Sequence, residues 1–297
     1  MRTAILFAAL FCVGAAAGAR AEVKFGPAEP AAKSFQVGAL RLTALHDAQI
    51  IVTNDGKTFG LGVSTRAVGD VLRAAGAPTD RIALSANALL VRTGHRLILI
   101  DTGIGPRLHG ALPASLKMAG VSPGDVTDVL ITHPHPDHIG GLIDAQGQLA
   151  FPNATIRMAS AAWSWMKQKA PAVMITTVTP RIQTFEPGAR IAPGIVSVSL
   201  PGHTPGHVGY EIMSGHSRLL DIGDVAHSSI VSLARPEWAI EFDADQDIAG
   251  ATRIKTLRAL AKSHEWVFAP HFPFPGVGHI VAAGRAFAWD PGDPGSP

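Results

Sequence analysis

The segment that most constrains this chain is an apolar run that leads directly into three histidines and an aspartate. Residues 128–132 read Asp-Val-Leu-Ile-Thr, and His133, His135, Asp137 and His138 follow within six positions. Residues two apart on an extended segment point the same way, so both His133 and His135 can meet one ion. Imidazole and carboxylate groups suit zinc and related divalent ions. The segment therefore predicts a metal site just beyond a buried strand.

Other apolar runs end in side chains of the same kind. The polar residues that follow them are Asp101, His203, Asp224 and His271. Strands that end at one edge of a sheet deliver their next residues to one place, where ligands commonly bind. We therefore expect these four side chains to lie near the histidine segment.

Short apolar runs alternate with turn residues along the chain, and helical spacing appears between them. This pattern predicts a layered α/β (α+β) fold with one domain over residues 37–289. A Pro/Ala-rich linker is expected over 22–36 and a frayed tail over 290–297. Asp243 and Asp245 are expected to cap the last long helix rather than to bind metal. Expected strands cover 40–45, 87–93, 96–100, 128–132, 154–159, 195–200, 208–213 and 218–221, and expected helices cover 66–75, 115–119, 160–169 and 247–263.

The amino terminus has the pattern of a secretory signal peptide over residues 1–21. A positive start is followed by a short uncharged run and by small residues around Arg20. The run is shorter than the ~20 residues that a membrane-spanning helix needs, and a retained anchor is the alternative. If this segment is cleaved, we expect a periplasmic or secreted protein with no stable membrane anchor.

Cleavage also changes the chemistry that the chain can offer. It removes Cys12, the single cysteine, together with Arg2 and Arg20, so that the formal net charge falls from +2 to zero. The remaining chain has no thiolate to act as nucleophile or metal ligand. It also lacks the basic excess typical of nucleic-acid binders, so no nucleic acid is expected as a partner.

Taken in order, the His133–His138 segment, His203, Asp224 and His271 resemble the metallo-β-lactamase superfamily, over residues 89–279. The resemblance implies an αββα sandwich with the site at one edge of its two sheets. It also implies that Asp101 does not bind the metal itself but orients one of the metal-binding side chains. The implied ligands are His133, His135 and His203 for a first metal and Asp137, His138 and His271 for a second, with Asp224 bridging the two.

Local motifs are similar to one branch of that superfamily. Phe151-Pro-Asn-Ala, His203-Thr-Pro-Gly-His207 and Phe274-Pro-Gly-Val-Gly-His279 resemble the secreted methyl parathion hydrolases, which sit near the N-acyl homoserine lactonases. His207 and His279 are expected to support the site or to cap loops. The missing cysteine departs from the commonest class B β-lactamases, which argues against β-lactam hydrolysis.

The resemblance implies a secreted hydrolase with two divalent ions, zinc first, with manganese, cobalt and iron as alternatives. A hydroxide that bridges the metals is expected to attack a lactone, an ester or a phosphotriester. The residues assigned to catalysis are Asp137, Asp224 and His227. Homoserine lactonases carry a tyrosine where this chain has His227, and an imidazole at that position can still donate a proton. A solvated loop histidine is the alternative reading.

The substrate is expected to be a lipophilic small molecule. Two irregular segments, 105–113 and 171–186, carry apolar residues that predict a substrate pocket. Trp163 and Trp165 fit either a substrate cleft or a helix core, and a homodimer is left open as the assembly state. The other functions considered are an iron-dependent oxidoreductase similar to sulfur dioxygenases, a β-lactamase and a non-catalytic binding protein. The apolar residues that predict the pocket in segments 105–113 and 171–186 are Leu108, Leu112, Met174, Ile175 and Val178.

Overall fold

The fold was analysed in a computed structural model that describes residues 23–295. The expected signal peptide at 1–21 lies outside the described residues, as do the last two residues of the chain. Among the described residues, no helix has both the length and the apolar character needed to cross a membrane.

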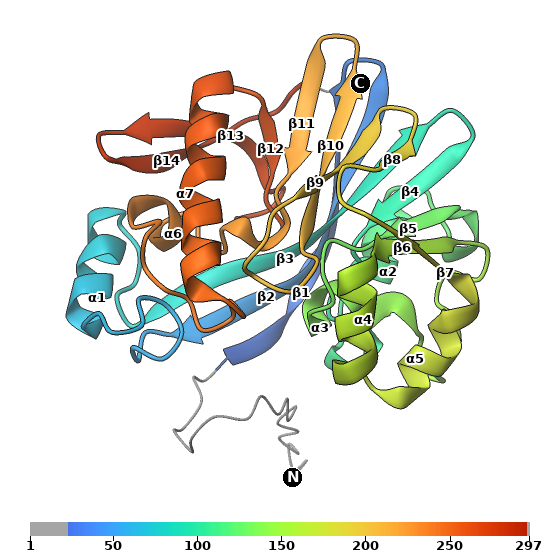
Figure 1. The fold of residues 1–297 in the computed structure, drawn as a ribbon, viewed down its shortest axis with the longest axis horizontal. Coiled ribbons are helices and arrows are strands. Elements are labelled where there is room, and N and C mark those ends of the chain that lie inside the picture. The colour runs from blue at the N-terminus through green and yellow to red at the C-terminus, as the bar shows by residue number, and fades with distance from the viewer. Residues whose placement is uncertain (1–22, 296–297) are drawn as a thin grey trace.

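Two seven-stranded sheets make up the centre of the molecule (Figure 1), and in each the strands follow one another in chain order. In the first sheet, β1 to β4 are antiparallel and β4 to β7 are parallel. The first sheet comprises β1 (Val23–Val37), β2 (Leu40–Thr53), β3 (Arg81–Thr93), β4 (Arg96–Ile100), β5 (Asp128–Leu130), β6 (Thr155–Ala159) and β7 (Ile182–Phe185). The second comprises β8 (Arg190–Ala192), β9 (Ile195–Ser199), β10 (Val208–Ser214), β11 (Ser217–Asp221), β12 (Trp266–Phe268), β13 (Val277–Ala283) and β14 (Ala286–Pro291).

Helices lie on both sides of the paired sheets (Figure 1). The helices α2 to α5 gather on the side of β4 to β7, α1 lies beside α6 on the opposite side, and the long α7 lies along the second sheet. Their bounds are α1 (Thr65–Ala74), α2 (Leu112–Met118), α3 (Pro136–Ile139), α4 (Ser160–Lys169), α5 (Ala172–Val178), α6 (Val231–Ala234) and α7 (Gln246–Ser263).

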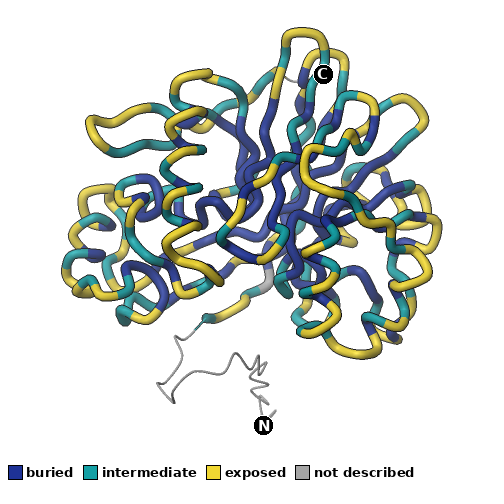
Figure 2. The backbone as a smooth tube through the Cα atoms, viewed as in Figure 1, coloured by how far each residue is buried: buried dark blue, intermediate teal, exposed yellow. Residues whose placement is uncertain are grey.

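Alternating apolar side chains divide the core into layers. In β3 and β4, Leu89 and Ile98 pack between the two sheets, whereas Leu90 and Leu99 face the other way, toward α2, α4 and α5. On the far side, Leu257 of α7 packs on the outer face of the second sheet. Figure 2 shows this buried centre between exposed helix surfaces. The order of layers is therefore helix, sheet, sheet, helix, which confirms the predicted αββα architecture.

The N-terminal segment differs from its prediction. Residues 22–36 were expected to form a linker, but 23–37 form β1, which pairs with β2 at the edge of the first sheet. The register shifts between Pro27 and Ala31, where the prolines lie. An edge strand tolerates proline because its outer side needs no backbone donor, and composition alone therefore misled the prediction. At the other end, β14 continues to Pro291, into the segment expected to fray.

Asp47 of β2 holds the chain that follows β4. Its Oδ2 atom accepts the backbone N–H of Ile104 at 2.7 Å, and its Oδ1 atom accepts that of Leu112 at 2.8 Å. Gly103 has a φ of +68° and lies so close that an added Cβ would be 2.1 Å from the Asp47 carboxylate. Burial raises the pKa of Asp47 to about 6. This one carboxylate thus fixes both ends of the loop beside the histidine segment.

Candidate metal centre

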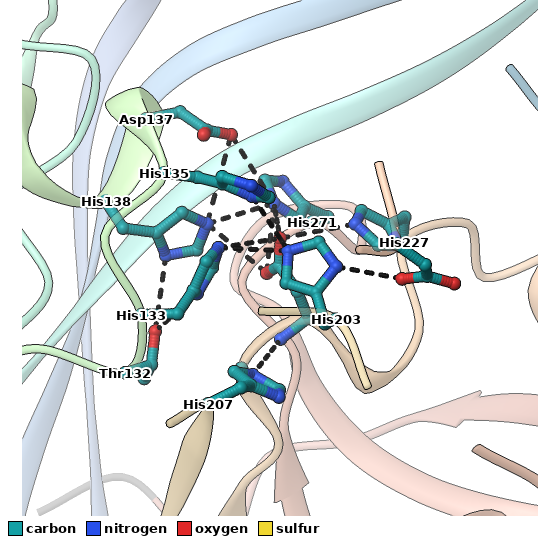
Figure 3. A network of polar contacts seen from close by, with 12 residues as sticks. Thr132, His133, His135, Asp137, His138, His203, His207, His227 and His271 are labelled. Carbon is teal, nitrogen blue, oxygen red and sulfur yellow. Dashed lines mark hydrogen bonds and ion pairs between the residues drawn. The ribbon is translucent and has the colours of Figure 1, made fainter. Parts of the chain in front are cut away.

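The predicted site residues come from the ends of strands in both sheets. His133, at the start of the histidine segment, follows β5, while His203, Asp224 and His271 follow β9, β11 and β12. Parallel pairing of β4 with β5 and of β11 with β12 puts these strand ends at one edge. Pro136 begins the short helix α3, which turns the segment so that all its ligand-type side chains face inward (Figure 3).

Three histidines and an aspartate form a first group. The Nε2 atom of His203 lies 3.1 Å from Nε2 of His133 and 2.9 Å from Nδ1 of His135. The Oδ2 atom of Asp224 lies 3.2 Å from the same His203 nitrogen. The potential ligand atoms of the four residues all lie within 4.8 Å of one another, which is the spacing that one ion requires.

A second group forms beside the first. The Nε2 atoms of His138 and His271 lie 3.3 Å apart, and Oδ2 of Asp137 lies 3.9 and 3.6 Å from them. Asp224 reaches this group through Oδ1, which lies 3.2 Å from both histidine nitrogens. Asp224 therefore contacts both groups, although its Oδ2 also lies 3.2 Å from Nε2 of His271. The structure brings together every residue that the sequence predicted as a ligand, with Asp224 between the two sets.

The outward-facing ring nitrogens show why a cation fits here. Nδ1 of His138 donates to Asp101 at 2.7 Å, Nδ1 of His203 to Asp243 at 2.9 Å and Nδ1 of His271 to the Ser85 carbonyl at 2.7 Å. A neutral imidazole that donates from one nitrogen has only a lone pair on the other. The inward nitrogens therefore turn lone pairs toward one another and toward the carboxylate of Asp224. Metal ions satisfy such a donor set, and the outward acceptors are the partners that metal-bound histidines usually have.

The electrostatics of these groups show the same demand for positive charge, which either protons or a metal ion can supply. Burial, reinforced by the nearby His138, holds the pKa of His133 well below its usual value. Burial by itself also lowers the pKa of His138, but the carboxylates of Asp224 and Asp101 raise it well above the usual value. Burial disfavours the charged form of Asp224, yet the surrounding histidines hold the pKa of this aspartate well below its usual range. The site thus carries negative charge that protons or metal ions must balance.

His207 and His279, both expected in supporting roles, differ in their distance from the site. His207 donates from Nδ1 to the carbonyl of Leu200 at 2.7 Å, and its Nε2 accepts the backbone N–H of Asp224 at 3.0 Å. Burial lowers the pKa of His207 to about 3, which keeps the ring neutral for both bonds. His279 lies instead on β13 against Trp266, with ring centroids 3.9 Å apart. His207 therefore holds the backbone of the shared aspartate.

One hydrogen-bond partner of the metal groups, Asp243, was not predicted from the sequence. Asp245 caps α7 as predicted, through a bond from Ile248 N–H. Asp243, assigned to the same cap, instead binds His203 with one oxygen and Arg253 with the other. Burial raises the pKa of Asp243, but the hydrogen bond from His203 outweighs it and the pKa stays below the usual value. No local pattern marks this role, because Asp243 and His203 are 40 positions apart.

His227 lies inside the site rather than in solvent. It is 2 % exposed, and its ring stacks on that of His271 with planes 8° apart. Nε2 lies 3.2 Å from Oδ2 of Asp224, but neither ring nitrogen has a hydrogen-bond partner of good geometry within residues 23–295. Asp224, His227 and His271 also form a third group with ligand spacing. The alternative reading of His227 as a solvated loop residue is therefore wrong.

The predicted apolar pocket does not form as expected. Segment 171–186 contains α5, and the side chains of Met174 and Val178 pack into the core with Leu112 of α2. Trp165 of α4, in contrast, is only half-buried and meets the ring of His135 edge-on, with centroids 5.7 Å apart. The aromatic surface beside the metal groups therefore comes from Trp165 of α4. The pocket prediction for 171–186 was wrong because the weak periodicity of this segment hid the helix α5.

Comparison with solved structures shows likeness to a dizinc lactonase and to a second hydrolase. AidC, a dizinc quorum-quenching lactonase in complex with a product, N-hexanoyl-L-homoserine, is 30 % identical with a TM-score of 0.83. The hydrolase AbOPH, of the beta-lactamase superfamily, is 31 % identical with a TM-score of 0.80. Each match covers 89 % of this chain and 98 % of the other.

Sequence comparison gives the same family. The probable metallo-hydrolase Rv2300c of Mycobacterium tuberculosis is 28 % identical over 177 residues. That match covers 48 % of this chain and 57 % of the relative, so it spans little more than half of the relative's length. Residues 81–271 match the family described as the metallo-beta-lactamase superfamily. This match covers most of the chain and includes every residue of both metal groups, and the chain belongs to the metallo-beta-lactamase superfamily.

Proposed function

We propose that this protein is a hydrolase that opens lactones and also accepts esters or phosphotriesters. It would hold two divalent ions, and zinc is the first candidate for both. One observation carries the proposal: two complete groups of histidine and aspartate ligands share Asp224. The likeness to a dizinc lactonase, at 30 % identity over nearly the whole chain, supports both the metal pair and the substrate class.

In this proposal His133, His135 and His203 hold the first ion, Asp137, His138 and His271 hold the second, and Asp224 is shared. Paired ions of this kind activate water at neutral pH and polarise the oxygen of the bound substrate. Asp101 and Asp243 keep His138 and His203 in the tautomer that presents Nε2 inward. His207 fixes the backbone of Asp224.

His227 is proposed to donate a proton to the leaving group. It lies in the site, close to Asp224, and no hydrogen bond within the described residues occupies its ring nitrogens. Imidazole is a common proton donor near neutral pH, although burial lowers the pKa of His227 below its usual value. Trp165 is proposed to receive the apolar part of the substrate, since its ring is half-buried and contacts His135.

The experiment combines metal analysis with a substrate panel. Purified protein is loaded with zinc, and its metal content is measured beside hydrolysis of an acyl homoserine lactone, an aryl ester and a phosphotriester. We expect about two ions per chain and metal-dependent turnover of the lactone. Absence of metal-dependent turnover on all three substrates contradicts the proposal.

A second candidate is an iron-dependent oxidoreductase related to sulfur dioxygenases, for which one iron per chain suffices. The second ligand group disfavours it, because Asp137, His138 and His271 lie together in ligand spacing. Iron near one per chain in protein expressed without added zinc, with oxygen consumption on a persulfide, would favour this candidate.

We further propose that the protein acts in the periplasm or outside the cell, directed there by residues 1–21. The positive, apolar and small-residue parts of that segment support the proposal. Amino-terminal sequencing of protein secreted by a bacterial host tests it, with Glu22 expected as the first residue.

A further inference from the structure

Arg253 of α7 is a fully buried cation with no role in the mechanism above. It is 1 % exposed. Burying a guanidinium costs much free energy unless its donors are paired, so the partners of such a residue indicate what it organises. Here the partners include the backbone directly after Asp224 and the carboxylate of Asp243, which also binds His203.

The guanidinium reaches three segments at once. Its Nε donates to the Val225 carbonyl at 2.7 Å, and its Nη1 donates to the carbonyls of Pro236 and Trp238 at 3.1 and 3.2 Å. Its Nη2 donates to Oδ2 of Asp243 at 2.7 Å. Val225 directly follows Asp224, which both metal groups share. One side chain thus holds the turn of the shared aspartate and the carboxylate that accepts a hydrogen bond from His203 of the first group.

Asp243 passes this constraint on to a metal group. Its other oxygen, Oδ1, accepts the Nδ1 proton of His203 at 2.9 Å. Backbone hydrogen bonds join the same two segments. The N–H groups of Ala244 and Asp245 donate to the carbonyls of His203 and Gly202, each at 2.9 Å. Gly202 fits so tightly against α7 that an added Cβ would lie 2.2 Å from the nitrogen of Ala249. A continuous series of hydrogen bonds therefore leads from Arg253 on α7 through Asp243 to His203 in the site.

We propose that Arg253 is a positioning residue for the metal centre, which aligns His203 through Asp243 and the shared Asp224 through the Val225 carbonyl. The inference rests on the metal pair of the proposed function. Arginine is needed because its planar fork sends donors in three directions, whereas a lysine ammonium donates from one point and cannot span these partners.

Metal affinity tests this role. Arg253→Lys keeps the charge but removes the fork, and the exposed Arg258→Lys on the same helix is the matched control. Affinity is measured on protein shown to be folded by circular dichroism, by competition for zinc with a chromophoric chelator. The absorption spectrum of the cobalt(II)-loaded protein reports the ligand geometry.

We expect Arg253→Lys to bind zinc about 10–100-fold more weakly, with an altered cobalt spectrum, and Arg258→Lys to behave as the wild type. A purely structural arginine lowers only the melting temperature. Folded Arg253→Lys with wild-type affinity and an unchanged cobalt spectrum therefore overturns the proposal.

Asp243→Asn supplies a second test, which also decides the question if Arg253→Lys does not fold. It removes the carboxylate that links the guanidinium to His203 and leaves the shape nearly unchanged. We expect a similar loss of affinity, and a loss in the double variant smaller than the product of the two single losses, because both act through one contact. Wild-type affinity in folded Asp243→Asn overturns the proposal. Hydrolysis does not enter the comparison, so an inactive wild type that binds two ions contradicts only the proposed function.

Discussion

The Nε2 atoms of His138 and His271 face each other at 3.3 Å, although both rings already donate a proton from Nδ1. Zinc should therefore stabilise the fold, by about 4 kcal/mol at a thousandfold excess over its Kd. Because Asp224 and Asp101 raise the pKa of His138, binding should also release protons and weaken as the pH falls. Thermal melts with zinc or with chelator at pH 6 and pH 8 measure both effects. Equal melting temperatures in all four conditions would contradict this prediction.

His135→Ala should weaken metal binding strongly, because His135 lies in the first group itself. We expect the loss to exceed the ~10–100-fold that is typical when a residue hydrogen-bonded to a metal ligand is removed. Hydrolysis should fall with metal content. The exposed His216→Ala serves as the control and should match the wild type in both measurements. Full metal content together with full activity in His135→Ala would mean that His135 is not a ligand.

His227→Phe should lower kcat by about 100-fold while metal content stays at the wild-type level, since a proton donor contributes 10²–10⁴-fold. Phenylalanine keeps a ring that can stack on His271 and lacks the donor. Metal analysis and steady-state kinetics on the same sample check the prediction. If half of the metal is lost instead, His227 is a ligand of the third group rather than a donor.

Trp165→Ala should raise KM for lactones with long acyl chains more than for short ones. Each methylene that loses contact with the ring costs up to ~0.8 kcal/mol, or about fourfold in affinity. Initial rates across a series of chain lengths give the slope of KM against length. A uniform change in KM at all lengths would place the acyl chain away from α4.

Asp47→Asn should destabilise the protein more at pH 4 than at pH 7. The pKa of Asp47 is raised from 3.8 to about 6 by burial, so the folded state favours the protonated carboxyl. That contribution to stability is complete below about pH 4 and is lost as the pH rises through about 6, a change of about 3 kcal/mol. Urea unfolding of both proteins with chelator present measures the difference, and exposed Asp80→Asn should show no such trend.

The residues of the two candidate metal groups were predictable because their signal is local. The segment from His133 to His138 spans one strand end, and each later ligand directly follows an apolar run. Asp243 and Arg253 were not predictable, since their contacts arise from the docking of α7 on the turn around His203. The strand at 23–37 was missed for a related reason, because its pairing with β2 is a tertiary fact that proline-rich composition obscures.

The two sheets contribute to the metal groups in unequal but complementary shares. The segment from His133 to His138 extends from the first sheet, whereas His203, Asp224 and His271 extend from the second. Ions held between them would act as non-covalent cross-links across the interface of the two halves. Residues 23–295 contain no cysteine, so the stabilising role that disulfides have in many extracellular proteins would fall to the bound ions, and loss of metal would loosen the sandwich as well as stop the chemistry.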